Sequence, residues 1–501
     1  MPKQHYLFSF LAGAVLTLAF APFEYRIIAL ISPAIFFHLL YSANSLKQHM
    51  GISYLFGVGL FATGASWIFY SMYFFSQAHI VLAIGLTSLF VLLMALFFLP
   101  LALLAYYLRQ SHRLLTLVLI FPAVWVLAEW LRGWLFTGFP WLYLAHTHID
   151  DFLINVAPIG GGLLVSWLSA TLSGLLIAFL LGDKRERVIT ASATGVLLIS
   201  VYATQFIQWT SPLDQAFKVT LLQGNIPQQE KWLPENLHPT IERYQEMTNQ
   251  HLDSDIIIWP ETALPSYFHL HLENLIEPLN KLSTDTNTDI ILGGFFHNSE
   301  GKAGAENSIL AISGNSREIY SKQHLVPFSE YIPFLEHLRW LEKWIKLPYD
   351  SVKRGQGSTL LTVAGYRAQM SVCYEDAYGN EIIEGLPEAH FLINVSNDGW
   401  FTGSIEPFQH MEIARLRAVE TGRYLLRSTN IGVSGIVDHK GRIVASAPAY
   451  TTTSITGLAQ AREGSTFYVR FGNYLAITLI ILTLLMTMAC SKKPLTSRIS
   501  K

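Results

Sequence analysis

The stretch AQMSVCYEDAYGN, residues 368–380, ends an apolar run at Cys373 and continues at once with Tyr374, Glu375 and Asp376. Its first half has the length and apolar character of a buried β-strand. Free cysteines are most often small buried hydrophobes, and a packed residue at a strand end is the simplest interpretation. The alternative is a nucleophile at the carboxyl end of a strand, where α/β folds place their ligands.

Two other stretches place a chemically useful side chain at a strand exit. DIIIWPETALP, residues 255–265, delivers Glu261 after an apolar run. REIYSKQHLVPFSEYIPF, residues 317–334, places Lys322 after a strand-like run and Glu330 in a loop between prolines. A charged residue at a strand end is usually solvated surface, but a nucleophilic thiol needs a base and a cation beside it. The three exits supply glutamate, lysine and cysteine in that order.

The region around these three exits, about residues 217–465, has the texture of a folded domain, with short apolar runs between turn signals. Apolar residues on both faces of the strands predict an α/β fold with a sheet core covered by helices. The expected strands lie within 217–226, 255–262, 289–296, 308–313, 368–375, 390–397 and 424–438, and the expected helices within 237–252 and 406–423.

The rest of the chain is too apolar for a soluble protein: of 501 residues, 51% are hydrophobic and only 14% are charged. A formal charge of -2 is almost neutral and gives no indication of a nucleic-acid partner, whose phosphates would require a basic stripe. A helix spans a bilayer with roughly 20 apolar residues, which predicts a polytopic α-helical membrane protein with about eight spans. They are expected at 6–22, 27–42, 52–74, 80–107, 115–132, 158–182, 188–207 and 472–490.

The predicted domains are a seven-helix transmembrane domain (1–210), a catalytic domain (217–465), a C-terminal transmembrane helix (470–490) and a basic tail (491–501). Lys and Arg collect in alternate gaps between the spans, which places both termini in the cytoplasm and residues 217–465 on the opposite, periplasmic side. The second cysteine, Cys490, falls in the last span, so a disulfide with Cys373 is geometrically implausible. Cys373 is therefore predicted to be a free thiol in an oxidising compartment.

With Glu261, Lys322 and Cys373 in this order, residues 217–465 resemble the Glu-Lys-Cys nitrilase, or carbon-nitrogen hydrolase, superfamily. With seven helices before and one after, the whole resembles the bacterial apolipoprotein N-acyltransferases. The supporting stretches are LLQGNIPQQEKW (221–232), KQHLVPFSEYIPF (322–334), SVCYEDAYGN (371–380), NVSNDGWF (394–401) and QHMEIARLRAVETGRYLLRSTNIG (409–432). Ser329 and the run NDGWFTGS depart from the family pattern, which affects local loop shape rather than the triad.

The resemblance implies an αββα sandwich and a set of residue roles. Glu261 is then the general base, Lys322 the oxyanion stabiliser and Cys373 the nucleophile. Three residues support them, Glu330, Tyr374 and Glu375, and Trp232 lies near the substrate.

The implied reaction moves an acyl chain from phospholipid, through a thioester on the cysteine, to the N-terminal amine of the diacylglyceryl-cysteine of an apolipoprotein. It takes place at the bacterial inner membrane and uses no cofactor and no metal. His324, His390 and His410 lack zinc-ligand spacing and are interpreted as loop or helix-face histidines.

Two alternatives stay open at this point, and a third, a transporter, is not favoured. A membrane-anchored amidase or nitrilase-type hydrolase would use the same triad and release the acyl group to water. A noncatalytic membrane scaffold would bind lipid or protein through the outer domain. A transporter would need charged residues in its spans, of which Glu129 is the clearest, but its neighbour Arg132 predicts a structural pair instead.

Overall fold

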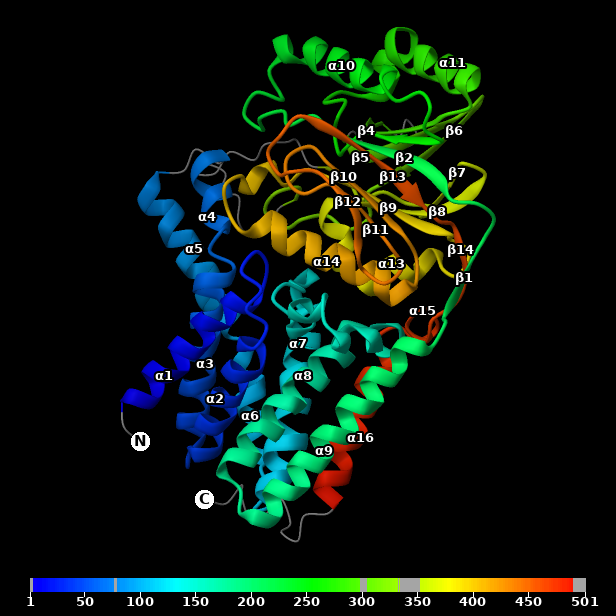
Figure 1. Ribbon diagram of the computed structural model, residues 1–501. Coiled ribbons are helices and arrows are strands. Elements are labelled where there is room, and N and C mark those ends of the chain that lie inside the picture. Colours follow the sequence, from blue (N-terminus) through cyan, green and yellow to red (C-terminus); the bar gives the residue numbers. More distant parts are fainter. Residues whose placement is uncertain (1–2, 76–78, 298–303, 332, 334–351, 490–501) are drawn as a thin grey trace. The chain divides into compact units, whose positions relative to one another are not determined.

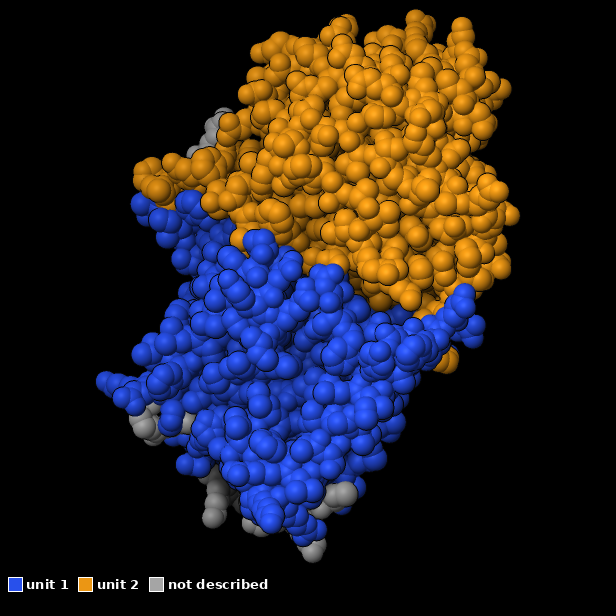
Figure 2. Space-filling model, in the orientation of Figure 1, with its two compact units in different colours: residues 1–69, 81–208, 470–501 blue, residues 70–80, 209–469 orange. Residues whose placement is uncertain are grey.

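The computed structural model describes residues 3–75, 79–297, 304–331, 333 and 352–489. These residues form two compact units, which Figure 2 distinguishes by colour. Unit 1 holds the described residues within 1–69, 81–208 and 470–501, and unit 2 those within 70–80 and 209–469. The C-terminal apolar helix thus belongs to the same unit as the N-terminal helices. Cys490 and the predicted tail 491–501 lie outside the described residues.

Unit 1 consists of helices (Figure 1). They are α1 (Gln4–Leu16), α2 (Ile28–Ser42), α3 (Leu46–Gly64), α5 (Ile80–Ala95), α6 (Phe98–Leu108), α7 (Phe121–Arg132), α8 (Ala157–Leu181), α9 (Lys184–Ala203) and α16 (Tyr474–Ala489), with α4 (Ile68–Tyr70) at the boundary between the two units.

Judged by length and composition alone, fewer helices are able to span a membrane than the sequence predicted. Among the described residues, four helical segments are long and apolar enough to cross a bilayer: Ile80–Leu108, Leu115–Arg132, Phe152–Leu181 and Lys184–Phe206. A fifth results if Leu46–Gly64 and Ile68–Phe75, which bend by 58°, form one span. The other three predicted spans coincide with shorter apolar helices, at Gln4–Ala19, Ile28–Ser42 and Tyr474–Ala489. The predicted total of eight is therefore not confirmed, because these helices fall short of roughly 20 residues.

Small residues bring α1 and α3 into close contact. A Cβ atom at Gly13 would lie 2.0 Å from the carbonyl oxygen of Phe56, and one at Gly59 would lie 2.1 Å from that of Phe10. Only glycine allows the two backbones to approach this closely. Packing through small residues is typical of helices in a membrane, where burial in lipid supplies no force to bring helices together.

Glu129 and Arg132, the pair that raised the transporter alternative, are both buried, at 4% and 3% exposure. Glu129 accepts hydrogen bonds from the indole of Trp125 at 2.9 Å and the backbone N–H of Leu144 at 3.0 Å. Arg132 donates to the carbonyl oxygens of Phe139, at 2.9 Å, and Trp141. These bonds tie helix α7 to the chain that follows it, which is a structural role.

Unit 2 contains two six-stranded sheets and a small two-stranded one. The first sheet has the order β13-β2-β3-β4-β5-β6 and the second the order β12-β11-β10-β9-β8-β7, while β1 pairs with β14. The strands are β1 (Thr210–Pro212), β2 (Phe217–Gln223), β3 (Ile256–Ile258), β4 (Asp289–Phe296), β5 (Glu306–Ser313), β6 (Ser316–Ser321), β7 (Leu360–Val363), β8 (Tyr366–Val372), β9 (Phe391–Ser396), β10 (Leu425–Thr429), β11 (Gly435–Val437), β12 (Ile443–Ser446), β13 (Thr453–Ala459) and β14 (Arg462–Gly464).

Helices cover the outer faces of both large sheets, so unit 2 has four layers (Figure 1). Residues such as Val219, Met370 and Ile393 fill the space between the sheets. Helices α10 (Pro234–Asn249) and α11 (Glu277–Thr286) cover the first sheet, and α13 (Gly379–Ile382) and α14 (Glu406–Thr421) cover the second. Every strand and helix expected from the sequence in this region is present.

The strand directions bring several carboxyl ends to one edge. Strands β2, β3 and β4 are parallel, and β6 returns to their direction after two antiparallel steps. Strands β8, β9 and β10 are parallel in the second sheet. The hydroxyl of Ser428, near the end of β10, donates to the carbonyl oxygens of Leu222, at 2.9 Å, and Ile258, at 3.1 Å. The carboxyl ends of both sheets therefore meet at the same edge of the sandwich.

Candidate active site

Cys373 directly follows β8 and begins a short helical turn, Cys373–Ala377. Its backbone has φ = +54°, a left-handed conformation that is unfavourable for any residue with a Cβ atom. Asn394 on the neighbouring strand β9 donates to the carbonyl oxygen of Cys373 at 3.2 Å and fixes the turn from below. The cysteine is partly exposed. Strained backbone that presents a reactive atom is a recurring property of catalytic sites.

Glu261 lies in the turn after β3 and is 8% exposed. Its carboxylate accepts a hydrogen bond of 2.7 Å from the side-chain amide of Asn307 on β5. The turn lies directly against β4, because a Cβ atom at Gly293 would be 2.8 Å from the Cα of Glu261. Burial raises the pKa of Glu261 and the nearby Glu330 adds to the increase, against the opposing effect of Lys322.

Lys322 directly follows β6 and is 1% exposed. Its Nζ lies 2.9 Å from a carboxylate oxygen of Glu330, whose other oxygen accepts from the backbone N–H of Val326 at 2.7 Å. Burial alone would lower the pKa of Lys322, but Glu330, Cys373 and Glu261 outweigh it and hold the pKa above its usual value. Lys322 is therefore a permanent cation.

The thiol of Cys373 interacts electrostatically with both partners. Burial and the charge of Glu261 raise its pKa well above the usual value, while Lys322 opposes the shift. The thiol is therefore protonated at rest and cannot act as a nucleophile until a base removes its proton. Glu261 is a stronger base than an exposed glutamate because its own pKa is raised.

Glu375 connects the turn of the cysteine to the strand exit of the lysine. Its two carboxylate oxygens accept from the hydroxyl of Tyr320, at 2.9 Å to each oxygen, and from three backbone N–H groups, those of Val372 and Gln323 at 2.6 Å and His324 at 2.9 Å. Residues from β6, β8 and the loop after β6 thus share one buried anion. Glu375 therefore holds the cysteine turn and the strand exit of Lys322 in place. Its lone pairs are already used by these donors, so none is left to accept a further proton.

The last two predicted site residues lie around this centre. The ring of Tyr374 is 5.1 Å from that of Tyr378 and 6.1 Å from that of His324, both measured between ring centroids. The ring of Trp232 lies 5.9 Å from that of Phe295, at the end of β4. Both side chains are partly exposed.

A second charged cluster lies behind the cysteine turn and was missed by the sequence interpretation, which treated His410 as a helix-face residue. His410 on α14 bonds to Asp376 through Nε2 and to Asp398 through Nδ1, both at 2.9 Å. Arg427 on β10 pairs with the same two aspartates, at 2.7 and 3.2 Å. Burial and Arg427 would lower the pKa of His410, but the two aspartates raise it to about 10.

The second cluster also offers the ligand types of a metal site. Asp398, Glu406 and His410 bring one ligand atom each within 4.8 Å of one another. However, both ring nitrogens of His410 already have protein partners, Asp398 at Nδ1 and Asp376 at Nε2, each at 2.9 Å. Arg427 already neutralises Asp398. The arrangement fits a closed network of ion pairs better than a cation site.

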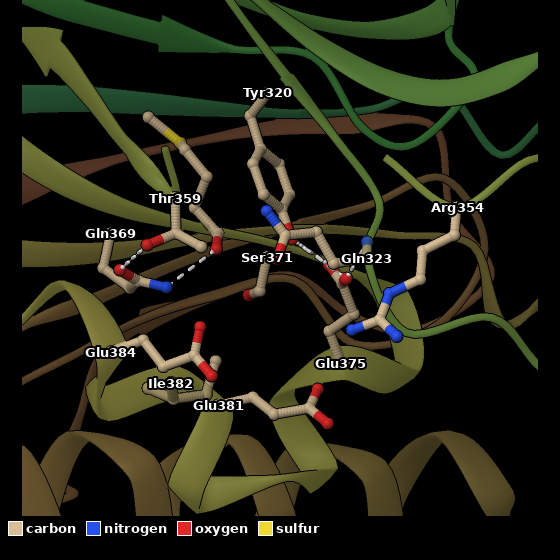
Figure 3. Close-up of a pocket in the computed structure, with 11 residues that line it drawn as sticks. Tyr320, Gln323, Arg354, Thr359, Gln369, Ser371, Glu375, Glu381, Ile382 and Glu384 are labelled. Carbon is tan, nitrogen blue, oxygen red and sulfur yellow. Dashed lines mark hydrogen bonds between the residues drawn. The ribbon is translucent and has the colours of Figure 1, made fainter. Parts of the chain in front are cut away.

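Glu375 also lines a small pocket of about 70 Å³ (Figure 3). Tyr320 and Gln369 line it from strands β6 and β8, and Glu375, Glu381 and Glu384 line it from the helical turns that begin at the cysteine. The described lining residues include neither the cysteine nor the base. At this volume the pocket holds water rather than an acyl chain.

Two further polar residues at the centre were not identified from the sequence. Asn307 orients the carboxylate of Glu261, and the only available signal was its place directly before a predicted strand. Lys231 is buried beside Glu261, with its Nζ 3.1 Å from the carbonyl oxygen of that residue. It directly precedes Trp232 in a stretch already linked to the substrate, and this adjacency was a usable signal.

Comparison with known proteins yields two family matches and several similar full-length chains. Residues 12–175 match the family described as apolipoprotein N-acyltransferase N-terminal domain, and residues 218–468 match carbon-nitrogen hydrolase. A protein of Methylococcus capsulatus named apolipoprotein N-acyltransferase is 41% identical over 476 residues, 94% of each chain. Proteins of the same name from Vibrio vulnificus and Coxiella burnetii are 37% and 36% identical, over 92% of both chains and over 95% of this chain and 98% of the other.

Proposed function

The chain belongs to the apolipoprotein N-acyltransferase family and is an acyltransferase of lipoprotein maturation, and we propose that Glu261, Lys322 and Cys373 carry its chemistry. The acyl donor is a phospholipid and the acceptor is the N-terminal amine of a diacylglyceryl-modified cysteine on an apolipoprotein. The observation that carries the proposal is the placement of a thiol, a buried carboxylate and a buried ammonium at strand exits on one edge of the sandwich.

In the first half-reaction, Cys373 attacks the ester carbonyl of the phospholipid. Glu261 takes the thiol proton as the S–C bond forms, and it returns the proton to the lipid alcohol as the C–O bond breaks. Lys322 stabilises the oxyanion of the tetrahedral intermediate, together with backbone N–H groups near the cysteine. The products are a lysophospholipid and a thioester on the protein.

In the second half-reaction, the amine of the acceptor attacks the thioester carbonyl. A C–N bond forms and the C–S bond breaks, and Glu261 transfers the proton of the amine to the departing thiolate. The products are the amide and the free thiol, so the catalyst is regenerated. Glu330 and Glu375 support this centre by holding the lysine and the cysteine turn, while Tyr374 and Trp232 contact the substrates.

Both substrates carry acyl chains, and each buried CH₂ group contributes about 0.8 kcal/mol to membrane anchoring. The enzyme must therefore meet them at a bilayer. We place the chain in the bacterial inner membrane with eight spans, the three shorter apolar helices included, and with both termini in the cytoplasm. The catalytic domain is then periplasmic, as the distribution of Lys and Arg favours.

Acyl transfer from a phospholipid labelled in its acyl chain tests the proposed chemistry. The protein should acquire label that neutral hydroxylamine removes, and Cys373→Ala should acquire none. Label that persists on Cys373→Ala would show that the nucleophile is another residue. A diacylated lipopeptide should then accept the label. Label that passes only to water would favour an amidase- or nitrilase-type hydrolase, and no label at all would favour a noncatalytic scaffold.

Topology has its own test. Single cysteines introduced at exposed positions of the catalytic domain should react with a membrane-impermeant thiol reagent in intact spheroplasts. Reaction only after lysis would reverse the proposed orientation. The control is a cysteine placed in the tail 491–501, which should react only after lysis.

A further inference from the structure

Lys231 is a second buried lysine at the centre. It is 1% exposed, and it lies in the turn that follows β2, one residue before Trp232. Its Nζ donates to the carbonyl oxygen of Glu261, at 3.1 Å, and to the hydroxyl of Thr262. Lysines are almost never fully buried without a reason, and here both acceptors belong to the turn that carries the general base.

The turn held by Lys231 is strained. Thr262 has φ = +46°, a left-handed conformation that is unfavourable for a β-branched residue. The backbone keeps such a conformation only when surrounding contacts impose it. Lys231 contacts the strained residue itself and the carbonyl oxygen of the residue before it, while Asn307 holds the carboxylate of Glu261.

The charge of Lys231 is sensitive to its surroundings. Burial lowers its pKa to about 7, and Glu261 and Cys373 limit the decrease. Glu261 also faces Lys322 and, beyond it, Glu330, so the two lysines act on one carboxylate from different strand exits. Lys322 is permanently charged, whereas Lys231 loses its proton close to neutral pH.

We propose that Lys231 is a positioning residue that holds the Glu261 turn and, in its charged form, favours the ionised thiol of Cys373. The inference rests on the proposed roles of Glu261 and Cys373 and adds a residue that the family resemblance did not supply. Removal of the side chain has two separable effects. The loss of two hydrogen bonds acts at every pH, and the loss of the positive charge acts only where the wild-type lysine is charged.

The electrostatic effect of Lys231 on the Cys373 thiol depends on pH. Below pH 7 the wild-type Lys231 carries its charge, which stabilises the thiolate and increases its fraction. Above about pH 8 the lysine is neutral, so an uncharged replacement loses nothing more in electrostatic terms. The advantage of wild type over Lys231→Met should therefore fall as pH rises. The groups that share this field are Glu261, Cys373, Lys322 and Glu330.

The experiment measures alkylation of Cys373 by iodoacetamide, a neutral reagent, from pH 6 to pH 9. The full-length protein is used in detergent without substrate, in a Cys490→Ser background so that one thiol remains. The variants are Lys231→Met and Lys231→Arg. The matched control is Lys218→Met, which removes a lysine of β2 whose partner is the surface residue Asp253.

We expect wild type to react about tenfold faster than Lys231→Met at pH 6, since one nearby charge shifts a pKa by about one unit. At pH 9 the ratio of the wild-type rate to the Lys231→Met rate should approach the value that the two lost hydrogen bonds alone produce. Lys218→Met should react at the wild-type rate throughout the range. A ratio that is constant across the range, or equal to one, overturns the proposal.

Lys231→Arg keeps a charge at every pH and covers the case in which the methionine variant fails to fold. It should react faster than wild type above pH 8, where the wild-type lysine has lost its charge. Equal reactivity of the arginine variant and wild type at every pH also overturns the proposal. Neither result depends on phospholipid, so a wild-type protein that forms no thioester contradicts the proposed function and leaves this measurement unaffected.

Discussion

Two charged clusters flank Cys373, and they differ in how completely their charges are matched. The rear cluster, Asp376, Asp398, His410 and Arg427, sets two carboxylates against two cations within direct hydrogen bonds. Burial raises the pKa of Glu406, which lies 3.6 Å from His410, so this third carboxyl is neutral and leaves the charges matched. In the front cluster, Glu261, Lys322, Glu330 and Lys231, one strong pair joins Lys322 to Glu330. The base there is held by an amide and keeps a raised pKa.

The difference in charge matching indicates a structural role for the rear cluster and a chemical role for the front cluster. A buried ion network with matched charges gains nothing from proton transfer, so it holds the cysteine turn in place. A buried base with incomplete compensation has a pKa moved toward the range in which it exchanges protons. Substitutions in the front cluster should therefore change rates at nearly constant stability, and substitutions in the rear cluster should change stability first.

Glu261→Gln should have the largest effect on rate. The amide keeps the size of the side chain but accepts no proton, and loss of a general base typically slows the chemical step by about 10²–10⁴-fold. Single-turnover formation of the hydroxylamine-sensitive label measures it. Thermal unfolding should be nearly unchanged, and a rate within a few-fold of wild type would remove Glu261 from the role of base.

Arg427→Met should have the largest effect on stability. It leaves Asp376 and Asp398 buried without their guanidinium, and breaking a buried ion pair on one side costs about 3–5 kcal/mol. Thermal unfolding in detergent should show a clear decrease in Tm. The control is Arg442→Met, whose side chain is 71% exposed. If both variants unfold at the wild-type temperature, the rear cluster is not structural.

Asn307→Ala should have a moderate effect in the front cluster. The substitution removes the 2.7 Å hydrogen bond that orients Glu261. Because this bond lowers the pKa of Glu261, its loss should raise that pKa. Hydrogen bonds to charged groups contribute about 1.5–3 kcal/mol, which corresponds to roughly 10- to 100-fold in the rate of thioester formation. The alkaline shift of the rising limb in the pH profile distinguishes this effect from general damage, which would lower the rate equally at all pH values.

The pH dependence of stability should have opposite signs for the two clusters. The folded pKa of His410, about 10, exceeds the usual 6.5, so its contribution is complete below pH 6.5 and is lost as pH rises through 10. Lys231, with a folded pKa of about 7 against the usual 10.5, makes stability increase over pH 7 to 10.5. His410→Asn should flatten the decrease in Tm between pH 7 and 10, and Lys231→Met should steepen it. Parallel curves for both variants would contradict the assignment.

The sequence was enough to predict candidate site residues that directly follow a strand. It was not enough to predict residues that contact the site from a different strand or loop. Glu261, Lys322 and Cys373 each come directly after an apolar run, so local pattern and chain order predicted them as site residues. Asn307 and Lys231 act at Glu261 from 46 and 30 residues away in the sequence. No local pattern encodes such a distance, because it depends on which strands become neighbours.

The fold shows the same division. Strands with long apolar runs, such as β4 and β9, were evident, whereas β12, with four residues, and β14, with three, are too short to give a periodic signal and were missed. In unit 1, apolar composition located every helix but not its length. The eight predicted spans therefore correspond to four or five helices of spanning length and three shorter ones among the described residues.

The backbone of Cys373 has a consequence for engineering this enzyme. A residue with a Cβ atom at φ = +54° costs of order 1 kcal/mol that glycine would not. Cys373→Gly should therefore raise the melting temperature while it abolishes acyl transfer. A search that ranks variants by thermostability alone would select against the nucleophile, so any library made from this chain has to be scored for turnover as well as for heat resistance.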